Sequence, residues 1–301
     1  MSAAPHMRPS PKRAVLMSAA NDPEEADASG AARSLPRHTS QPAAAERTFS
    51  LKDAQLGHVY LVGAGPGSPD LLTLRAHRLL TTATLILADG LISPEILALA
   101  NPAARILSVA KRCGGQPPVT QAPVTQDGIH TLMIDNARTG QSVLRLKSGD
   151  PLIFGRAGEE IAALRAAHIP FEIVPGITAA FAAAASLETP LTDRAAASKL
   201  ILATAHHAAN KLDLDPRPQP IWQGPLPPDA TLVLYMPGPN LEVLAHDLMR
   251  AGMDPFTPVT AISQASTSSE RIHSSTLKHL RSVDVGPAPV LLFIGRALRP
   301  S

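Results

Sequence analysis

Short apolar runs alternate with longer stretches of helical periodicity from Val59 onward. Such alternation is typical of α/β layers whose strands are largely parallel. The chain is therefore expected to form an α/β fold. The apolar runs predict nine strands, near residues 58–62, 84–88, 105–109, 142–147, 170–174, 199–204, 231–235, 257–262 and 290–295.

Two predicted helix starts have the same sequence pattern, a serine followed by a proline and an acidic residue. Ser68, Pro69 and Asp70 supply a capping side chain, a first-turn proline and an acid at the positive end of the helix dipole. Ser93 begins the same order, followed by proline and glutamate. The first helix is expected to bury one apolar face, formed by Leu71, Leu72, Leu79 and Leu80.

The chain is expected to divide into three parts. Residues 1–55 are rich in Ala, Ser, Pro and mixed charge and lack sustained periodicity, which predicts a disordered tail. The basic beginning of this tail leaves an organelle-targeting peptide open as an alternative. The stretch from Pro170 to Gly176 separates two series of strands and helices. We therefore expect an N-terminal α/β domain over residues 56–172 and a C-terminal α/β domain over residues 173–299.

Composition argues against several classes of protein. The net charge is +2 and the basic residues are scattered, so no general attraction to nucleic acid or to an anionic membrane is expected. Only 3% of the residues are aromatic, which disfavours a base-stacking surface. The apolar runs are shorter than the roughly 20 residues that a membrane crossing requires. Cys113 is the only cysteine, which excludes an internal disulfide and a multi-cysteine zinc site and fits a reducing cytoplasm. No bound metal is expected.

A glycine-rich turn, residues 63–68 (GAGPGS), joins the first strand to the first helix start. Helix N-termini of this kind hold anions, so one interpretation is a nicotinamide dinucleotide site with Asp89 as the ribose-binding acid. However, Ser68 stands where that fingerprint has its last glycine, and Pro66 lacks the N–H that a phosphate would use. A tight turn with close helix packing is the commoner outcome on spacing alone.

Three longer motifs follow one another: GAGPGSPDLLT (63–73), RLKSGDPLIFGRAGEE (145–160) and VPGIT (174–178). They resemble motifs of the tetrapyrrole methylase family, within which the chain is most similar to the uroporphyrinogen-III C-methyltransferases. The likeness includes ADGLIS (88–93), AKR (110–112), PLTDR (190–194) and LYM (234–236). It implies two α/β domains, usually in a homodimer, with S-adenosylmethionine (SAM) and a tetrapyrrole in the cleft between the domains. The implied reaction methylates uroporphyrinogen III at C2 and C7 to give precorrin-2.

The resemblance assigns roles to individual positions. Asp89 and Lys111 correspond to the family's proposed acid/base pair. The positions that would contact SAM are Pro66, Ser148, Gly149, Asp150, Ile153, Thr178, Ala179, Met236 and Ala265. Candidate partners for the substrate's carboxylates are Arg112, Arg156, Arg194 and His206.

Several of these residues also have an ordinary structural interpretation. Met236, at the end of a buried strand, is more often a core residue than a ligand contact. Asp150 stands before a proline, where turn chemistry explains it equally well. Lys111 and Arg112 fit a solvated loop, and Arg156 fits the surface of the helix that it begins.

Five positions depart from the family's motifs and leave the substrate open. They are Ser68 in place of Asp, Ser148 and Pro237 in place of Gly, Asp193 in place of His, and Ala205 in place of Gly. The loop over residues 115–126 is longer than the family's. Two alternatives therefore stay open: a methylase of a later corrin ring, or a diverged SAM-binding protein without turnover.

Overall fold

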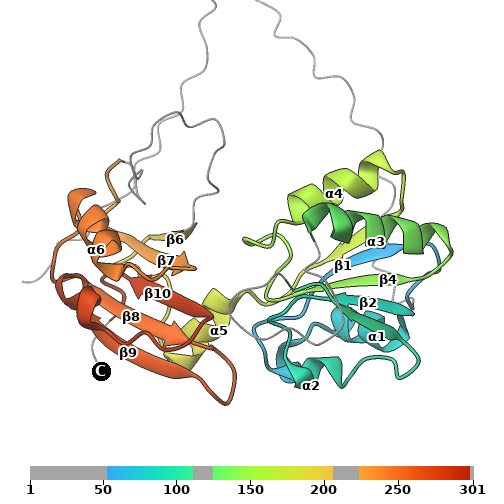
Figure 1. Cartoon of the computed structure of the whole chain (residues 1–301). Helices are drawn as coiled ribbons and strands as arrows, with labels where there is room; N and C mark the ends of the chain where they lie inside the picture. Colours follow the sequence, from blue (N-terminus) through green and yellow to red (C-terminus); the bar gives the residue numbers. More distant parts are fainter. Residues whose placement is uncertain (1–52, 111–124, 206–223, 299–301) are drawn as a thin grey trace, which may run out of the picture. The chain divides into compact units, whose positions relative to one another are not determined.

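The computed structural model describes residues 53–110, 125–205 and 224–298, which form two five-stranded sheets with helices (Figure 1). The predicted α/β class is confirmed, and each of the nine predicted strands is present within one residue of its expected ends. Lys111, Arg112 and His206 lie outside the described residues, as do residues 1–52 of the expected tail. The described residues all fall within one compact unit, so the expected boundary between residues 172 and 173 stays a prediction.

The first sheet is entirely parallel, with the order β3-β2-β4-β1-β5. Its strands are β1 (Val59–Gly63), β2 (Leu85–Ala88), β3 (Arg105–Ser108), β4 (Val143–Lys147) and β5 (Phe171–Val174). Its helices are α1 (Leu74–Thr82), α2 (Pro94–Leu97), α3 (Gln126–Arg138) and α4 (Ala157–Ala166).

Helices cover both faces of this sheet, with α1 and α2 on one side and α3 and α4 on the other (Figure 1). Successive strand residues point to opposite faces. Leu144 and Leu146 of β4 accordingly pack with α1 and α2, whereas Val143 packs with α3 and α4. Double coverage explains why these strands read as nearly continuous apolar runs. The exceptions in β4 are Arg145 and Lys147, which are both buried.

The second sheet is mixed, with the order β6-β7-β10-β8-β9. Its strands are β6 (Lys199–Thr204), β7 (Ala230–Tyr235), β8 (Pro258–Ser263), β9 (Arg271–Thr276) and β10 (Val290–Ile294). Only β6 and β7 pair in parallel, so the expectation of largely parallel strands is wrong here. A short loop joins β8 to β9, and such a loop suits antiparallel neighbours, because a parallel pair needs a long crossover. One apolar cluster includes α5 (Ala179–Ser186), and another includes α6 (Leu241–Arg250) and the 3₁₀ helix η2 (Leu277–Ser282).

Strand β9 was not predicted, because its residues carry no apolar alternation. Four of its six residues are exposed, as expected of an edge strand that pairs only with β8. Throughout the described ranges, no helix is long and apolar enough to cross a membrane.

The first helix begins later than predicted. Pro69–Leu71 forms only a 3₁₀ turn (η1), and Ser68 accepts no capping hydrogen bond in the described part of the chain. Leu72 is extended (ψ 138°), and Thr73 then caps α1 by accepting a 3.1 Å hydrogen bond from Ala76 N. Of the expected apolar face, only the two later leucines belong to α1 and its core. The second predicted start is confirmed, because Ser93 Oγ accepts from Ile96 N at 3.3 Å at the start of α2.

Candidate active site at the carboxyl edge of the parallel sheet

The loops after β1, β4 and β5 meet at the carboxyl edge of the first sheet, where β1 lies between the other two strands. Gly65 N donates to Gly149 O at 3.1 Å, and Gly149 N donates to Gly65 O at 2.7 Å. A Cβ atom on Gly176 would lie 2.2 Å from Gly149 O, and one on Gly63 would lie 2.6 Å from the same oxygen. We call this set the glycine junction (Gly63, Gly65, Gly149 and Gly176). Only residues without a side chain allow its backbones to approach so closely.

The backbone hydrogen bonds of the glycine junction also bear on whether the first loop binds a dinucleotide. Ala64 N donates to Lys147 O at 2.8 Å, and Gly65 N is bonded to Gly149 O. Pro66 has no N–H to give. Backbone donors that a pyrophosphate cradle would use therefore serve the protein's own carbonyls, which favours the tight-turn interpretation.

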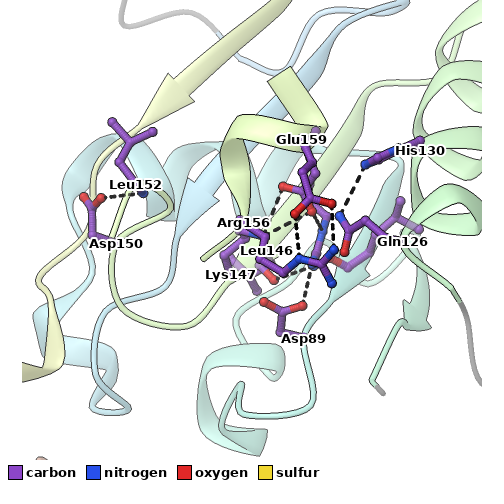
Figure 2. A network of polar contacts seen from close by, with 12 residues as sticks. Asp89, Gln126, His130, Leu146, Lys147, Asp150, Leu152, Arg156 and Glu159 are labelled. Atoms are coloured by element: carbon purple, nitrogen blue, oxygen red, sulfur yellow. Dashed lines mark hydrogen bonds and ion pairs between the residues drawn. The ribbon is translucent and has the colours of Figure 1, made fainter. Parts of the chain in front are cut away.

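Asp150 ties the loop after β4 to the loop after β5. Its Oδ1 accepts from Leu152 N at 2.8 Å, and its Oδ2 accepts from Gly176 N at 3.0 Å. Figure 2 shows Asp150 facing Leu152, apart from the charged residues around Asp89. Turn chemistry therefore accounts for Oδ1, a contact between two loops accounts for Oδ2, and the contact of Asp150 with SAM stays a prediction.

Thr178 and Ala179, at the start of α5, lie against this junction. Their Thr178 Cα and Ala179 N atoms are each 3.8 Å from the position that a Cβ on Gly149 would take. Tyr235, the last residue of β7, holds them from the other side. Its hydroxyl lies 2.6 Å from Thr178 Oγ1 and accepts from Ala180 N at 3.2 Å. Burial raises the pKa of the Tyr235 hydroxyl, so it stays protonated at neutral pH.

The loop after β8 reaches the glycine turn as well. A Cβ on Gly67 would lie 2.9 Å from Thr267 Cγ2 and 3.9 Å from Ala265 O. Within the loop after β4, Ile153 N donates to Asp150 O at 3.3 Å. These contacts, together with those above, join the loops that carry all nine positions predicted to contact SAM.

Five residues of these loops that are not glycine adopt the left-handed backbone conformation. They are Phe154, Arg156, Met236, Gln264 and Ser266, with φ between 49° and 66°. Such conformations cost about 1–3 kcal/mol each and concentrate at functional sites. Their gathering in the loops after β4, β7 and β8 is an independent reason to place a binding site there.

Met236 is not a core residue, so the interpretation favoured for it on sequence alone is wrong. Its side chain is 48% exposed, because the left-handed conformation turns it out of the strand. Phe154 is 40% exposed, and its ring centroid lies 4.9 Å from that of Tyr235. Leu152, in the same loop as Phe154, is also exposed, and Tyr235, which the Phe154 ring contacts, is hydrogen-bonded to Thr178.

Asp89 directly follows β2 and joins a network of charges (Figure 2). Its Oδ1 accepts from Arg145 Nη2 at 2.5 Å. Arg145 Nε donates to Glu160 Oε1 at 2.9 Å, and Lys147 Nζ donates to the same oxygen at 3.1 Å. Glu160 Oε2 lies 3.0 Å from Lys147 Nζ but receives no hydrogen bond from the described residues. We call Asp89, Arg145, Lys147 and Glu160 the charge cluster.

Three members of the charge cluster were missed in the sequence: Arg145, Lys147 and Glu160. The available indication was the alternation of Arg and Lys with leucines in a strand that is apolar on both faces. Burial lowers the pKa of Lys147, and the neighbouring Arg145 lowers it further, while Glu160 opposes both effects. Among the residues described, no three His, Cys, Asp or Glu side chains gather where they could hold a metal ion.

The predicted substrate contacts lie on the surface where they are described. Arg156 makes a two-pronged ion pair with Glu159, at 2.8 and 2.6 Å, and both side chains are 48% exposed. Arg194 is exposed. Asp193 accepts hydrogen bonds from Ala195 N and Ala196 N at 2.8 and 2.9 Å, so its carboxylate serves the local turn.

The two departures closest to the junction fit without strain. Ser148 is partly buried and has no left-handed φ, so its backbone accepts a side chain. Pro237 is buried, and the residue that follows it, Gly238, adopts the left-handed conformation. The geometry therefore gives no reason for either substitution to disrupt the loops.

The comparisons with known proteins all point to one family. The model of the family described as tetrapyrrole (corrin/porphyrin) methylases matches residues 58–281. A uroporphyrinogen-III C-methyltransferase of Paracoccus denitrificans is 43% identical over 246 residues, which cover 80% of this chain and 82% of that protein. A siroheme synthase of Nitrosococcus oceani is 43% identical over 242 residues, 79% of this chain but 49% of the relative. The chain thus spans about half the length of that synthase.

Solved structures agree with the sequence relatives. A uroporphyrin-III C-methyltransferase of Thermus thermophilus has 37% sequence identity and a TM-score of 0.64, covering 80% of this chain and 95% of that one. A structure of the Thermus protein complexed with S-adenosylhomocysteine gives 34% identity and a TM-score of 0.63, covering 80% and 98%.

Gly176→Ala tests the glycine junction. The new methyl group would meet Gly149 O at 2.2 Å, so the backbone must move. Overpacking of this kind costs about 1–3 kcal/mol, and we expect a lower urea midpoint of unfolding. Gly158→Ala, at an exposed position in α4 with nothing within 4 Å of the new Cβ, should be neutral or slightly stabilising. A Gly176→Ala variant as stable as wild type would show that the contact is not tight.

Proposed function

The chain belongs to the tetrapyrrole methylase family, and we propose that it methylates uroporphyrinogen III at C2 and C7, with SAM as donor, to give precorrin-2. The observation that carries this proposal is the set of contacts joining the loops of all nine predicted donor positions. The name of the Paracoccus denitrificans relative supports the choice of substrate. The name of the Nitrosococcus oceani relative supports sirohaem synthesis as the destination, with cobalamin-type synthesis as the alternative. We further propose a cytoplasmic homodimer, as the family resemblance implies.

The residues present fit SAM as the donor. SAM joins a sulfonium cation to adenosine and a polar tail, and it supplies the methyl group. Half-exposed Met236 and Phe154 offer apolar surface for the adenosine. Tyr235 fixes the start of α5 next to Gly149, where backbone can approach a ligand closely because Gly149 has no side chain.

Asp89 is the group we assign to proton transfer. Asp89 directly follows β2 and its side chain is 31% exposed, so a substrate can reach its carboxylate. Methyl transfer forms a carbon–carbon bond at the ring while the bond between carbon and sulfur breaks. The ring carbon is a better nucleophile when a pyrrole N–H loses its proton, and an Asp89 oxygen would accept that proton. The remaining rate gain would come from holding ring and donor in line, an effect worth up to roughly 7–11 kcal/mol.

Product analysis tests the proposal directly. Wild-type chain incubated with SAM and fresh uroporphyrinogen III under reducing, oxygen-free conditions should yield a product heavier by two methyl groups. Asp89→Asn should lower kcat by about 10²–10⁴-fold, the range for general acid–base groups, while S-adenosylhomocysteine still binds. The matched control is Asp135→Asn on the exposed surface of α3, which should have wild-type kcat.

Other outcomes of this assay separate the alternatives. Methylation of a corrin-ring intermediate, but not of uroporphyrinogen III, would favour the later-ring enzyme. SAM binding without transfer to any ring substrate would favour a binding protein.

The two tyrosines of the chain provide a second test. Tyr235→Phe removes the hydroxyl that contacts Thr178 and Ala180, and each such hydrogen bond is worth about 0.5–1.5 kcal/mol. We expect about tenfold weaker S-adenosylhomocysteine binding in calorimetry, which corresponds to about 1.4 kcal/mol. Tyr60→Phe removes a comparable bond, from Gln55 N at 2.8 Å, and should leave the affinity unchanged. Equal affinities of the two variants would contradict this role of Tyr235.

A further inference from the structure

We propose that Arg145, anchored by Glu160, is a positioning residue that fixes the direction of the Asp89 carboxylate; this inference rests on the proposed function. Arg145 touches both acids through different nitrogens, at 2.5 Å to Asp89 and 2.9 Å to Glu160. It is 3% exposed, so it acts through Asp89 and not on a substrate.

The guanidinium has little freedom to turn. Its Nη1 donates to Leu87 O and Leu146 O, both at 3.3 Å, and its Nε donates to Glu160. Because the group is planar and its five N–H bonds form a rigid fork, holding two nitrogens fixes the direction of the third. Nη2 therefore points at Asp89 from a position set by β2, β4 and α4. The backbone of Asp89 is held to β4, the strand of Arg145, since the Asp89 N–H donates to Leu146 O at 3.1 Å.

Burial indicates that this arrangement serves more than stability. Arg145, Lys147 and Glu160 are each at most 3% exposed, and buried ion networks are often no more stable than apolar side chains of similar size. The cluster contains two cations and two acids, so its formal charges balance. Asp89 is 31% exposed, so the charge cluster reaches solvent through this residue. Of the three buried charged groups, Arg145 contacts the accessible carboxylate, Glu160 holds Arg145, and Lys147 holds Glu160.

Lys147 completes the anchor from the other side. Its ammonium contacts both oxygens of Glu160, at 3.1 and 3.0 Å. Glu160 is thereby held between two cations and cannot swing away from Arg145 without leaving a buried charge unpaired, which is costly. The consequence is a carboxylate already oriented before substrate arrives, which reduces the rearrangement needed during reaction.

The test compares full-length variants in the uroporphyrinogen III assay. Arg145→Lys keeps the positive charge but loses the fork. We expect kcat to fall about 10- to 100-fold, as for residues that orient metal ligands, with unchanged KM for SAM. In the Asp89→Asn background the same change should cause no additional loss, because Arg145 acts through Asp89. Arg75→Lys is the control. It alters a similar two-pronged pair, with Glu172 at 3.0 and 2.7 Å, and should keep wild-type kcat.

Two results would overturn the inference: a folded Arg145→Lys variant with wild-type kcat, or a loss that multiplies fully with that of Asp89→Asn. If Arg145→Lys does not fold, Glu160→Gln replaces it, since the amide oxygen can still accept from Arg145 Nε without the charge. A smaller loss of kcat that is absent in the Asp89→Asn background supports the inference, and unchanged kcat overturns it. An inactive wild-type chain contradicts the proposed function itself, whereas an active wild type beside a fully active Arg145→Lys contradicts only the positioning role.

Discussion

Backbone packs directly against backbone where the loops after β1, β4 and β5 meet, and the position of the loops proposed to bind SAM depends on that contact. Gly65 and Gly149 exchange two hydrogen bonds, and Gly176 approaches so closely that a methyl group would overlap a carbonyl oxygen. A parallel sheet brings the carboxyl ends of neighbouring strands to one edge, where α/β proteins place their ligands. The absence of side chains then allows the loops to close over that edge. Asp150 joins the loops after β4 and β5 with one further hydrogen bond, which its Oδ2 accepts from Gly176 N.

Strand β4 connects this backbone contact to the charged residues. It lies between β2, which Asp89 follows, and β1, which the glycine turn follows. Its last residues point alternately to the two faces, so Arg145 and Lys147 reach Glu160 on α4 while the loop that follows carries Gly149. One strand thus sets both the donor loop and the carboxylate proposed to accept a proton. A shift of β4 would move the loop after β4 and the Asp89 carboxylate together. The position of one relative to the other is therefore kept by this strand.

Most of the strands could be predicted from the sequence, because burial leaves a pattern of apolar residues. Strands buried on both faces, such as β1 and β2, give continuous apolar runs, and all nine predicted strands were found. Strand β9 was missed because it is an exposed edge with polar residues. The first helix was placed too early because Ser68 and Pro69 make a good start by composition, whereas the chain extends at Leu72 before Thr73 caps it. Local residue preferences cannot show such a break, and they cannot show that Met236 turns outward in a left-handed conformation.

The charge cluster illustrates the same limit, because its members are separated in sequence and meet only through the pairing of β2 with β4 and the packing of α4.

The central claim is that SAM binds where the loops joined by the glycine junction meet. A crystal structure with S-adenosylhomocysteine tests it most directly. We predict the ligand against Pro66, Gly149, Ala179 and Met236, with its sulfur facing the side of Asp89. Adenosine bound elsewhere, or Ser148 and Pro237 occupying that space, would contradict the account.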